Sequence, residues 1–132
     1  MRIERIRTSP DPYEPYLLSQ GLGIGDLIFI SGQAGYTDAG PIIEGGFRAQ
    51  IDQAFANLGR ALEAGGSSLR NVVKVTIFVT DMGHFGEVVE ARRRHFAEPY
   101  PADTIVEVKG LYTPEAMIEI EAIALRSAAR EG

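Results

Sequence analysis

The feature that most constrains the fold is a change in hydrophobic period part-way along the chain, from a helical pattern to a strand pattern. Apolar residues in Gly46–Ala64 recur at spacings of three and four, which predicts an amphipathic helix that Gly65 and Gly66 end. Val72–Thr80 is rich in β-branched residues, which favours a strand. The apolar side of this strand is expected at Val73, Val75, Ile77 and Val79. The sequence therefore predicts a helix that leads directly into a strand.

Shorter patterns predict the other elements. The Ser19–Leu22 and Leu27–Ser31 runs fit a hairpin, because glycines separate them. Asp81 can cap a second helix over His84–Glu98. The apolar stripe of that helix is expected at Phe85, Val88, Val89 and Phe96. The remaining strands are expected at Met1–Arg7, Thr104–Val108 and Met117–Leu125, the first of them as a weak edge strand.

The order of these elements places the chain in the α/β (α+β) class, with a mixed sheet whose two helices act as crossovers and cover one face. The last strand indicates which side chains lie on the sheet face that the helices do not cover. One side of that strand presents Ile118, Ile120, Ala122 and Ala124, and the other side presents Glu119, Glu121, Ile123 and Leu125. A bare face with aliphatic side chains beside carboxylates is better explained by a partner subunit than by water. We therefore expect an oligomer with a polar pocket near its interface.

Composition excludes several classes of function. A chain of 132 residues with 45% hydrophobic content is expected to form one domain, residues 1–132. Its 13 basic and 18 acidic residues give a net charge of -5, which disfavours nucleic acid as a partner. Cysteine is absent, which excludes disulfides, thiolate catalysis and cysteine-ligated zinc. No segment has the length of a signal peptide or a membrane span, so we expect a cytoplasmic protein without a membrane partner.

Four motifs span most of the chain: SQGLGIGDLIFISGQ at Ser19–Gln33, AGGSSL followed by VTIFVTD within Ala64–Asp81, YPADTIVEV at Tyr100–Val108 and MIEIEAIAL at Met117–Leu125. In combination they resemble the YjgF/RidA (reactive intermediate deaminase, or Rid) family. The resemblance implies a chorismate-mutase-like fold and a homotrimer whose sheets form a central barrel, with pockets at the subunit clefts. It also implies hydrolysis of small reactive imines or enamines, with no cofactor and no metal.

The resemblance assigns roles to particular residues. Glu119 matches the glutamate that orients water in the family. Asp103 stands where the deaminases have an arginine that clamps the substrate carboxylate, and Thr104 and Ile105 continue that substrate-binding stretch. An anion at this position reverses a carboxylate clamp, because like charges in contact repel. Ordinary 2-imino acids are therefore expected to be poor substrates.

Other matches are partial. The family's tyrosine directly before SQ corresponds to Leu18, with Tyr16 displaced by two residues. The asparagine of the second helix corresponds to Val89. Ser31 and Gly32 of the SGQ motif are expected to hold substrate through their backbone, since glycine permits close approach.

Several of these residues also fit ordinary structural roles. Glu119 fits a solvated strand carboxylate, with Glu121 on the same face. Asp103 fits a strand start, a group that recognises a cationic or hydroxyl-bearing substrate, or half of a salt bridge that closes the cleft. His84 and His95 form no metal-ligand pattern, so surface or capping roles are expected for them.

Three functions remain open. The favoured one is a cofactor-independent hydrolase, similar to a deaminase, that acts on a small imine, enamine or related metabolite. A non-catalytic small-ligand-binding or regulatory trimer is the alternative. An endoribonuclease is the weaker alternative, because the acidic balance opposes RNA binding.

Overall fold

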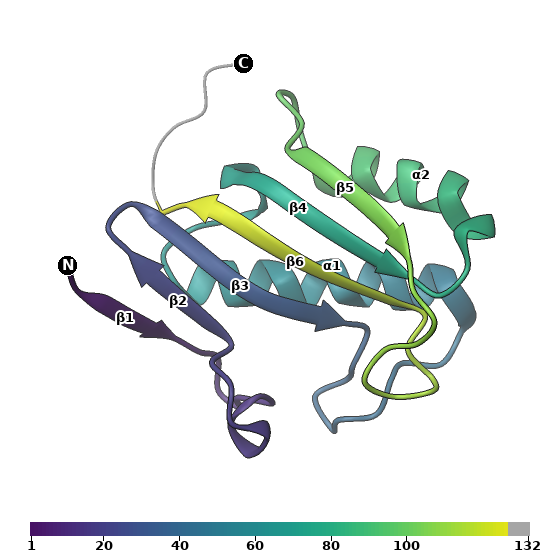
Figure 1. Ribbon diagram of the computed structural model, residues 1–132, viewed down its shortest axis with the longest axis horizontal. Coiled ribbons are helices and arrows are strands. Elements are labelled where there is room, and N and C mark those ends of the chain that lie inside the picture. The colour runs from purple at the N-terminus through teal and green to yellow at the C-terminus, as the bar shows by residue number, and fades with distance from the viewer. Residues whose placement is uncertain (127–132) are drawn as a thin grey trace.

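The computed structural model describes residues 1–126, so residues 127–132 of the expected domain lie outside this part. Within it, a six-stranded sheet has the order β1-β2-β3-β6-β4-β5 (Figure 1). The strands are β1 (Ile3–Ile6), β2 (Gly21–Ile24), β3 (Leu27–Ala34), β4 (Val72–Val79), β5 (Ala102–Glu107) and β6 (Ile118–Leu125). The helices are α1 (Gly46–Ala64) and α2 (Phe85–His95), with single 3-10 turns at Glu14–Tyr16, Leu69–Asn71 and Met82–His84.

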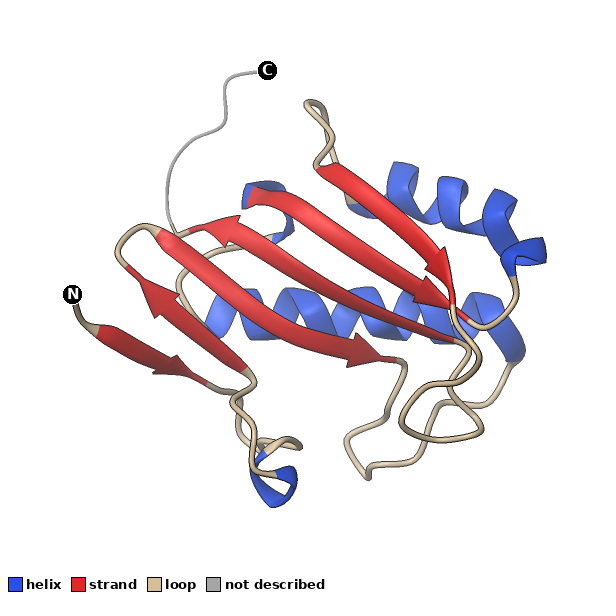
Figure 2. Ribbon diagram, viewed as in Figure 1, coloured by secondary structure: helices blue, strands red, loops and turns tan. Residues whose placement is uncertain are grey.

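The sheet is mixed, because it contains both parallel and antiparallel pairs of strands. α2 joins β4 to β5, which pair in parallel as the sequence predicted. α1 joins β3 to β4, and β6 lies between these two strands, antiparallel to both. Figure 2 shows both helices behind the same face of the sheet. The expected α+β architecture is confirmed.

The core fills the space between the sheet and the helices. In β6 the buried side chains alternate with more exposed ones, and the predicted inward set is confirmed. α2 contributes Val88 and Ala91, while α1 contributes a longer apolar stripe that includes Phe47, Ile51, Phe55 and Leu58. Burial of these apolar surfaces is the main source of the stability of the fold.

Three details of β4 and α2 correct the sequence prediction. A register shift between Val72 and Lys74 marks a β-bulge, so Val72 is buried in the core and Val73 is only partly buried. In α2, Phe85 is 45% exposed and does not belong to the buried stripe. The helix ends at His95 because Phe96 adopts an extended conformation and packs edge-on against Phe55 at a centroid distance of 5.2 Å.

The two histidines pack on phenylalanine rings. His84 stacks on Phe47 at 4.1 Å, and His95 stacks on Phe55 at 4.4 Å. His95 Nε2 also lies 3.0 Å from Asp52 Oδ1. These side chains therefore join α1 to the ends of α2, which is more than the surface or capping role that the sequence predicted.

The sheet face opposite the helices leaves apolar side chains in solvent. Leu27, Phe29 and Val106 are 39%, 38% and 37% exposed, and Ile3 at the sheet edge is 63% exposed. Lys74 lies on this face and donates a hydrogen bond to Thr104 at 2.8 Å. Neither helix of residues 1–126 covers this surface, which is the surface that the sequence predicted to be an interface.

Candidate functional site

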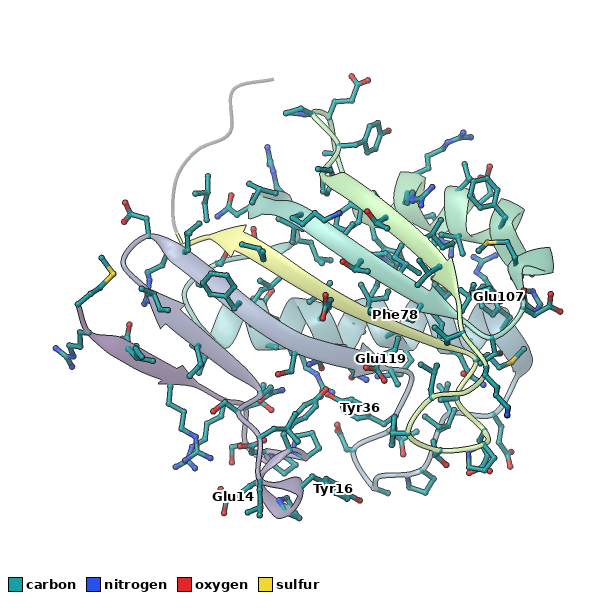
Figure 3. The ribbon with its side chains drawn as sticks, in the orientation of Figure 1. Glu14, Tyr16, Tyr36, Phe78, Glu107 and Glu119 are labelled. Atoms are coloured by element: carbon teal, nitrogen blue, oxygen red, sulfur yellow. The ribbon has the colours of Figure 1, made fainter. Side chains whose placement is uncertain are left out.

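A cavity of about 950 Å³ lies at the end of β3 and the start of β6. Its walls come from the N-terminal loop (residues 8–20), from residues 32–42 at the end of β3, from α1 and from residues 112–119. Figure 3 shows Glu119 and Tyr36 close to this end of the sheet, with Tyr16 farther out in the N-terminal loop. A small apolar cluster of Ala34, Tyr36 and Ala116, separate from the main core, contributes Ala34 and Tyr36 to its walls.

Glu119 is the carboxylate at the sheet end of this cavity. It pairs with Ala34 on β3 and Phe78 on β4, and its half-buried side chain lies on the face away from the helices. The carboxylate occupies the space beside Gly32, since a Cβ atom at Gly32 would overlap Glu119 Oε2. Burial raises the pKa of Glu119, and the negative charge of Glu121 raises it further. Such a group can accept a proton from water and return it to a leaving group.

A β-bulge in β3 presents Gly32 to this carboxylate. The pairing of β3 with β6 shifts register after Ile30, which takes Ser31 and Gly32 out of the regular ladder. The Ser31 hydroxyl donates to the Ser19 carbonyl at 2.6 Å, and the Ser31 N–H donates to the Gln20 carbonyl at 2.9 Å. Ser31 is thereby used within the fold, and Gly32 is the residue of the pair that lines the cavity.

Three tyrosines, Tyr13, Tyr36 and Tyr112, line the same cavity as the carboxylate. The Tyr13 hydroxyl donates to the Gly32 carbonyl at 2.6 Å, and the Tyr13 ring meets the Tyr36 ring edge-on at 6.2 Å. Burial raises the pKa of Tyr13, Tyr36 and Tyr112, and Glu119 adds to the rise for Tyr13 and Tyr112. The three hydroxyl groups are therefore protonated at neutral pH, and each can donate one hydrogen bond. Tyr36 donates its proton to Gln33 Oε1 at 2.6 Å, as Tyr13 does to Gly32, so of the three hydroxyls that of Tyr112 is available to a ligand.

Asp103 projects from the opposite face of the sheet. It pairs with Val75, whose side chain is fully buried under the helices, so Asp103 points toward α2. Arg92 on α2 holds it with two hydrogen bonds, from Nε at 2.8 Å and from a terminal nitrogen at 3.0 Å. The side chains are 17% and 23% exposed. Within one chain, Asp103 forms a salt bridge and does not line the cavity that contains Glu119.

The other predicted site residues are divided between the cavity and its surroundings. Tyr16 and Leu18 line the cavity, with 75% and 42% exposure. Thr104 lies on the open sheet face, Ile105 packs against the main core, and Val89 is partly buried on α2. These last three residues do not line the cavity. The structure thus brings together Glu119, Gly32, Tyr16 and Leu18.

Two features are absent from residues 1–126. These residues contain no cluster of three or more histidine, aspartate or glutamate side chains that could hold a metal ion. No helix in this part of the chain is both long and apolar enough to cross a membrane.

Comparison with known proteins identifies the family. The family model described as endoribonuclease L-PSP matches residues 6–126. The chain belongs to the YjgF/RidA (endoribonuclease L-PSP) family. A RutC family protein of Pyrococcus horikoshii is 39% identical over 119 residues, which cover 89% of this chain and 92% of that protein. The 2-iminobutanoate/2-iminopropanoate deaminase of Mus musculus is 37% identical over 119 residues, covering 89% of this chain and 86% of its own.

Solved structures agree with this assignment. RidA from an Antarctic Psychrobacter superposes with a TM-score of 0.85 at 35% sequence identity. The match covers 92% of this chain and 98% of the RidA chain. The resemblance inferred from the four motifs, and the fold that it implied, are confirmed.

Sequence reasoning missed several cavity residues in this family member. Tyr13, Tyr36 and Tyr112 come from three separate loops, and Arg60 comes from α1. One signal was present: the N-terminal loop repeats a proline-tyrosine pair, and Tyr13 in the first copy reaches Gly32. The 3-10 turn at Glu14–Tyr16 carries the second copy outward, which explains why Tyr16 is the more exposed tyrosine.

Proposed function

We propose that this chain is a cofactor-independent hydrolase of a small imine or enamine, with Glu119 as the residue that orients water and transfers protons. The observation that supports this most directly is the placement of the Glu119 carboxylate, half-buried beside Gly32 in a cavity walled by tyrosine hydroxyls. The naming of relatives as 2-iminobutanoate/2-iminopropanoate deaminases points to the same chemistry.

The reaction needs one water and returns every proton. Ionised Glu119 accepts a proton from water as the oxygen attacks the imine carbon. Glu119 returns this proton to the nitrogen, which gives a neutral carbinolamine. Glu119 then accepts the proton of the carbinolamine hydroxyl and delivers it to the nitrogen as the C–N bond breaks, so that ammonia leaves and a carbonyl product remains. An enamine enters the same sequence after protonation on carbon. The Tyr112 hydroxyl lines the cavity and can donate to the developing oxygen or nitrogen.

We further propose that the functional unit is a homotrimer. The support comes from the exposed apolar side chains of the helix-free sheet face, because a surface of this kind needs cover. Glu119 lies on that same face, so a partner subunit would stand close to the cavity mouth. A trimer is the assembly that the family resemblance implied.

Asp103 stands at the position of the family's carboxylate-binding arginine, and this difference bears on which substrate the chain accepts. In this chain Asp103 is neutralised by Arg92, so neither group offers a free charge to the Glu119 cavity. We propose that the substrate is not an ordinary 2-imino acid. The same ion pair supports the alternative of a non-catalytic ligand-binding trimer, because it leaves a cavity without the usual clamp.

Substitution of the two carboxylates on β6 tests the proposal. Glu119→Gln keeps the size of the side chain but cannot accept a proton, so kcat for imine or enamine hydrolysis should fall by about 100-fold or more. The assay measures ammonia release above the spontaneous rate. Glu121→Gln is the matched control, since Glu121 lies on the same face two residues away and does not line the cavity.

Equal losses in the two variants would assign only a general electrostatic role to Glu119. Full activity of Glu119→Gln would remove it from the mechanism. An absence of turnover in the parent protein, with retained ligand binding, would favour the non-catalytic alternative. RNA serves as a control substrate because the family model is described as an endoribonuclease.

A further inference from the structure

One positively charged side chain lines the cavity that contains Glu119. Among the described residues that line it, Arg60 on α1 is the only Lys, Arg or His side chain. We propose that Arg60 is the anion-binding group of this cavity. It would select ligands whose carboxylate is several bonds away from their amine or imine nitrogen.

A buried residue fixes the position of Arg60. Asn57 lies one helical turn earlier and is fully buried, and its amide nitrogen donates to the carbonyls of Ala34 and Tyr36 at 2.9 and 3.0 Å. The Asn57 oxygen is therefore turned outward, and it accepts a hydrogen bond from Arg60 at 2.6 Å. The guanidinium is thus anchored to the end of β3 through a rigid amide.

The second contact of Arg60 is exchangeable. A terminal nitrogen donates to Asp38 at 2.9 Å, but the Asp38 side chain is 72% exposed and the Arg60 side chain is 47% exposed. Exposed ion pairs of this kind are weak, because water screens both charges. A guanidinium has five N–H donors, and the two bonds described use only part of that set. An incoming carboxylate can therefore bind Arg60 beside Asp38 or in its place.

Arg60 and Glu119 are separated by tyrosine rings. Tyr13 donates to the carbonyl of Gly32, which adjoins Glu119, and the ring centres of Tyr13 and Tyr36 are 6.2 Å apart. Arg60 donates to the Asn57 oxygen, and Asn57 donates to the Tyr36 carbonyl, so Arg60 lies on the Tyr36 side. A 2-imino acid has its carboxylate bonded directly to the imine carbon, so the proposed use of Arg60 together with Glu119 favours a longer ligand.

The class of ligand follows from Glu119, from Arg60 and from the surface between these two side chains. Glu119 favours a cationic nitrogen, or an imine in need of water, and Arg60 favours a carboxylate. Between them, the tyrosine rings and Ala34 offer an apolar surface to a short methylene chain. The fitting class is an ω-amino carboxylate or the imine derived from one. The imine part of this statement rests on the proposed function, whereas the Arg60 contact does not.

Binding of stable ω-amino acids tests the proposal without requiring turnover. Isothermal titration of the whole protein with 4-aminobutanoate, 5-aminopentanoate and 6-aminohexanoate should show at least one ligand that binds tenfold more tightly than alanine. Arg60→Gln should weaken that ligand at least tenfold and leave butylamine, which has no carboxylate, unchanged. Asp38→Asn removes the competing carboxylate and should strengthen binding several-fold.

Arg48→Gln is the matched control. Arg48 is an exposed arginine on the same helix that also pairs with an aspartate, and it does not line the cavity. Its substitution should leave the Kd unchanged. If Arg60→Gln fails to fold, the Asp38→Asn variant carries the test alone. A preference for alanine over every ω-amino acid, or equal binding by the parent and Arg60→Gln, overturns the proposal, and so does unchanged or weaker binding by Asp38→Asn.

The outcomes separate this inference from the proposed function. Arg60-dependent binding of an ω-amino acid without any deamination would refute the hydrolase and support the anion site. Glu119-dependent deamination, in a protein whose binding of every ω-amino acid is unaltered by Arg60→Gln, would support the hydrolase and overturn the anion site.

Discussion

Gly32 has no side chain, and the carboxylate of Glu119 occupies the space that a side chain would fill. Two observations at the residue scale therefore depend on each other. The bulge in β3 turns Gly32 toward the cavity, and the absence of a Cβ atom allows Glu119 to lie against its backbone. Tyr13 then fixes the Gly32 carbonyl with a 2.6 Å hydrogen bond. Glycine is required here by close packing, as in other places where a backbone and a functional group must approach closely.

A methyl group at position 32 should displace the carboxylate without unfolding the protein. In Gly32→Ala the added Cβ overlaps the end of a flexible side chain, which can rotate away, so the midpoint of thermal unfolding should change by only a few degrees. Turnover should fall about tenfold or more, because Glu119 leaves its position. Gly86→Ala is the control, since a Cβ there meets nothing within 4 Å. Unchanged turnover in Gly32→Ala would show that the contact is not needed.

The raised pKa of Glu119 predicts a direction for the effect of pH. Because the ionised form is the base, kcat should fall as the pH is lowered through the pKa of Glu119, which lies above its ordinary value of 4.5. Burial raises this pKa, so the group favours folding below its unfolded pKa, and this contribution is lost as the pH rises through the folded pKa.

At neutral pH, Glu119→Gln should therefore be at least as stable as the parent protein in urea. A marked loss of stability in Glu119→Gln would contradict the assignment of burial as the cause of the pKa shift.

At the scale of elements, the two helices are joined by one carboxylate. Asp52 on α1 accepts hydrogen bonds from Arg48 at 2.9 Å, from Arg94 at 2.6 Å and, across 3.0 Å, from His95. Arg94 and His95 lie in the last turn of α2, where positive charge also complements the helix dipole. Burial alone would raise the pKa of Asp52, but the hydrogen bonds from His95, Arg94 and Arg48 outweigh it and lower this pKa. The pairing keeps α2 against α1 and, through Arg92, against β5.

Asp52→Asn should lower the free energy of unfolding by about 1 kcal/mol at neutral pH. The effect is modest because the Asp52 side chain is 38% exposed and solvent screens its charges. A lowered pKa means that the stabilisation is present above the unfolded pKa of aspartate and is lost as the pH falls through the folded pKa. Urea unfolding at neutral and acidic pH measures the difference between variant and parent.

Glu90→Gln provides the comparison for Asp52→Asn. It removes one negative charge from an exposed pair with Arg93 on α2 and does not link the helices. An equal loss of stability in Glu90→Gln would show that overall charge, and not the link between the helices, explains the effect.

At the scale of the whole molecule, the sheet has one covered face and one bare face. The bare face combines Leu27, Phe29 and Val106 with the carboxylates of Glu119 and Glu121. Covering these apolar side chains with a partner subunit would remove them from water, which is favourable. The cavity lies at the end of this same face, so assembly and chemistry are expected to depend on each other.

Light scattering on a size-exclusion column tests the assembly. A homotrimer has three times the chain mass of 14.4 kDa, and Phe29→Asp should shift the protein toward the single-chain mass, because a buried unpaired charge opposes association. Leu17→Asp is the control, since Leu17 is 95% exposed in the N-terminal loop and lies outside the sheet. A parent protein with a mass near 14.4 kDa at micromolar concentration would contradict the proposed interface.

The sequence alone determined the elements whose pattern is local. The helical spacing in α1 and the alternation in β6 each report which side of an element is apolar, and both were confirmed. Pattern also placed Glu119 on the face away from the helices, because neighbouring strand residues point in opposite directions. The four motifs together were specific enough to indicate the family.

Only the tertiary structure decided the features that depend on distant segments. The bulge at Val72 changes which valine is buried, and no local propensity reports a register shift between strands. The partner of Asp103 is set by how α2 packs on β5, and the contacts of Tyr13 and Arg60 are set by where two loops cross the end of β3. Such contacts form between side chains far apart in sequence, so their geometry exists only once the core has fixed the relative positions of helix and sheet.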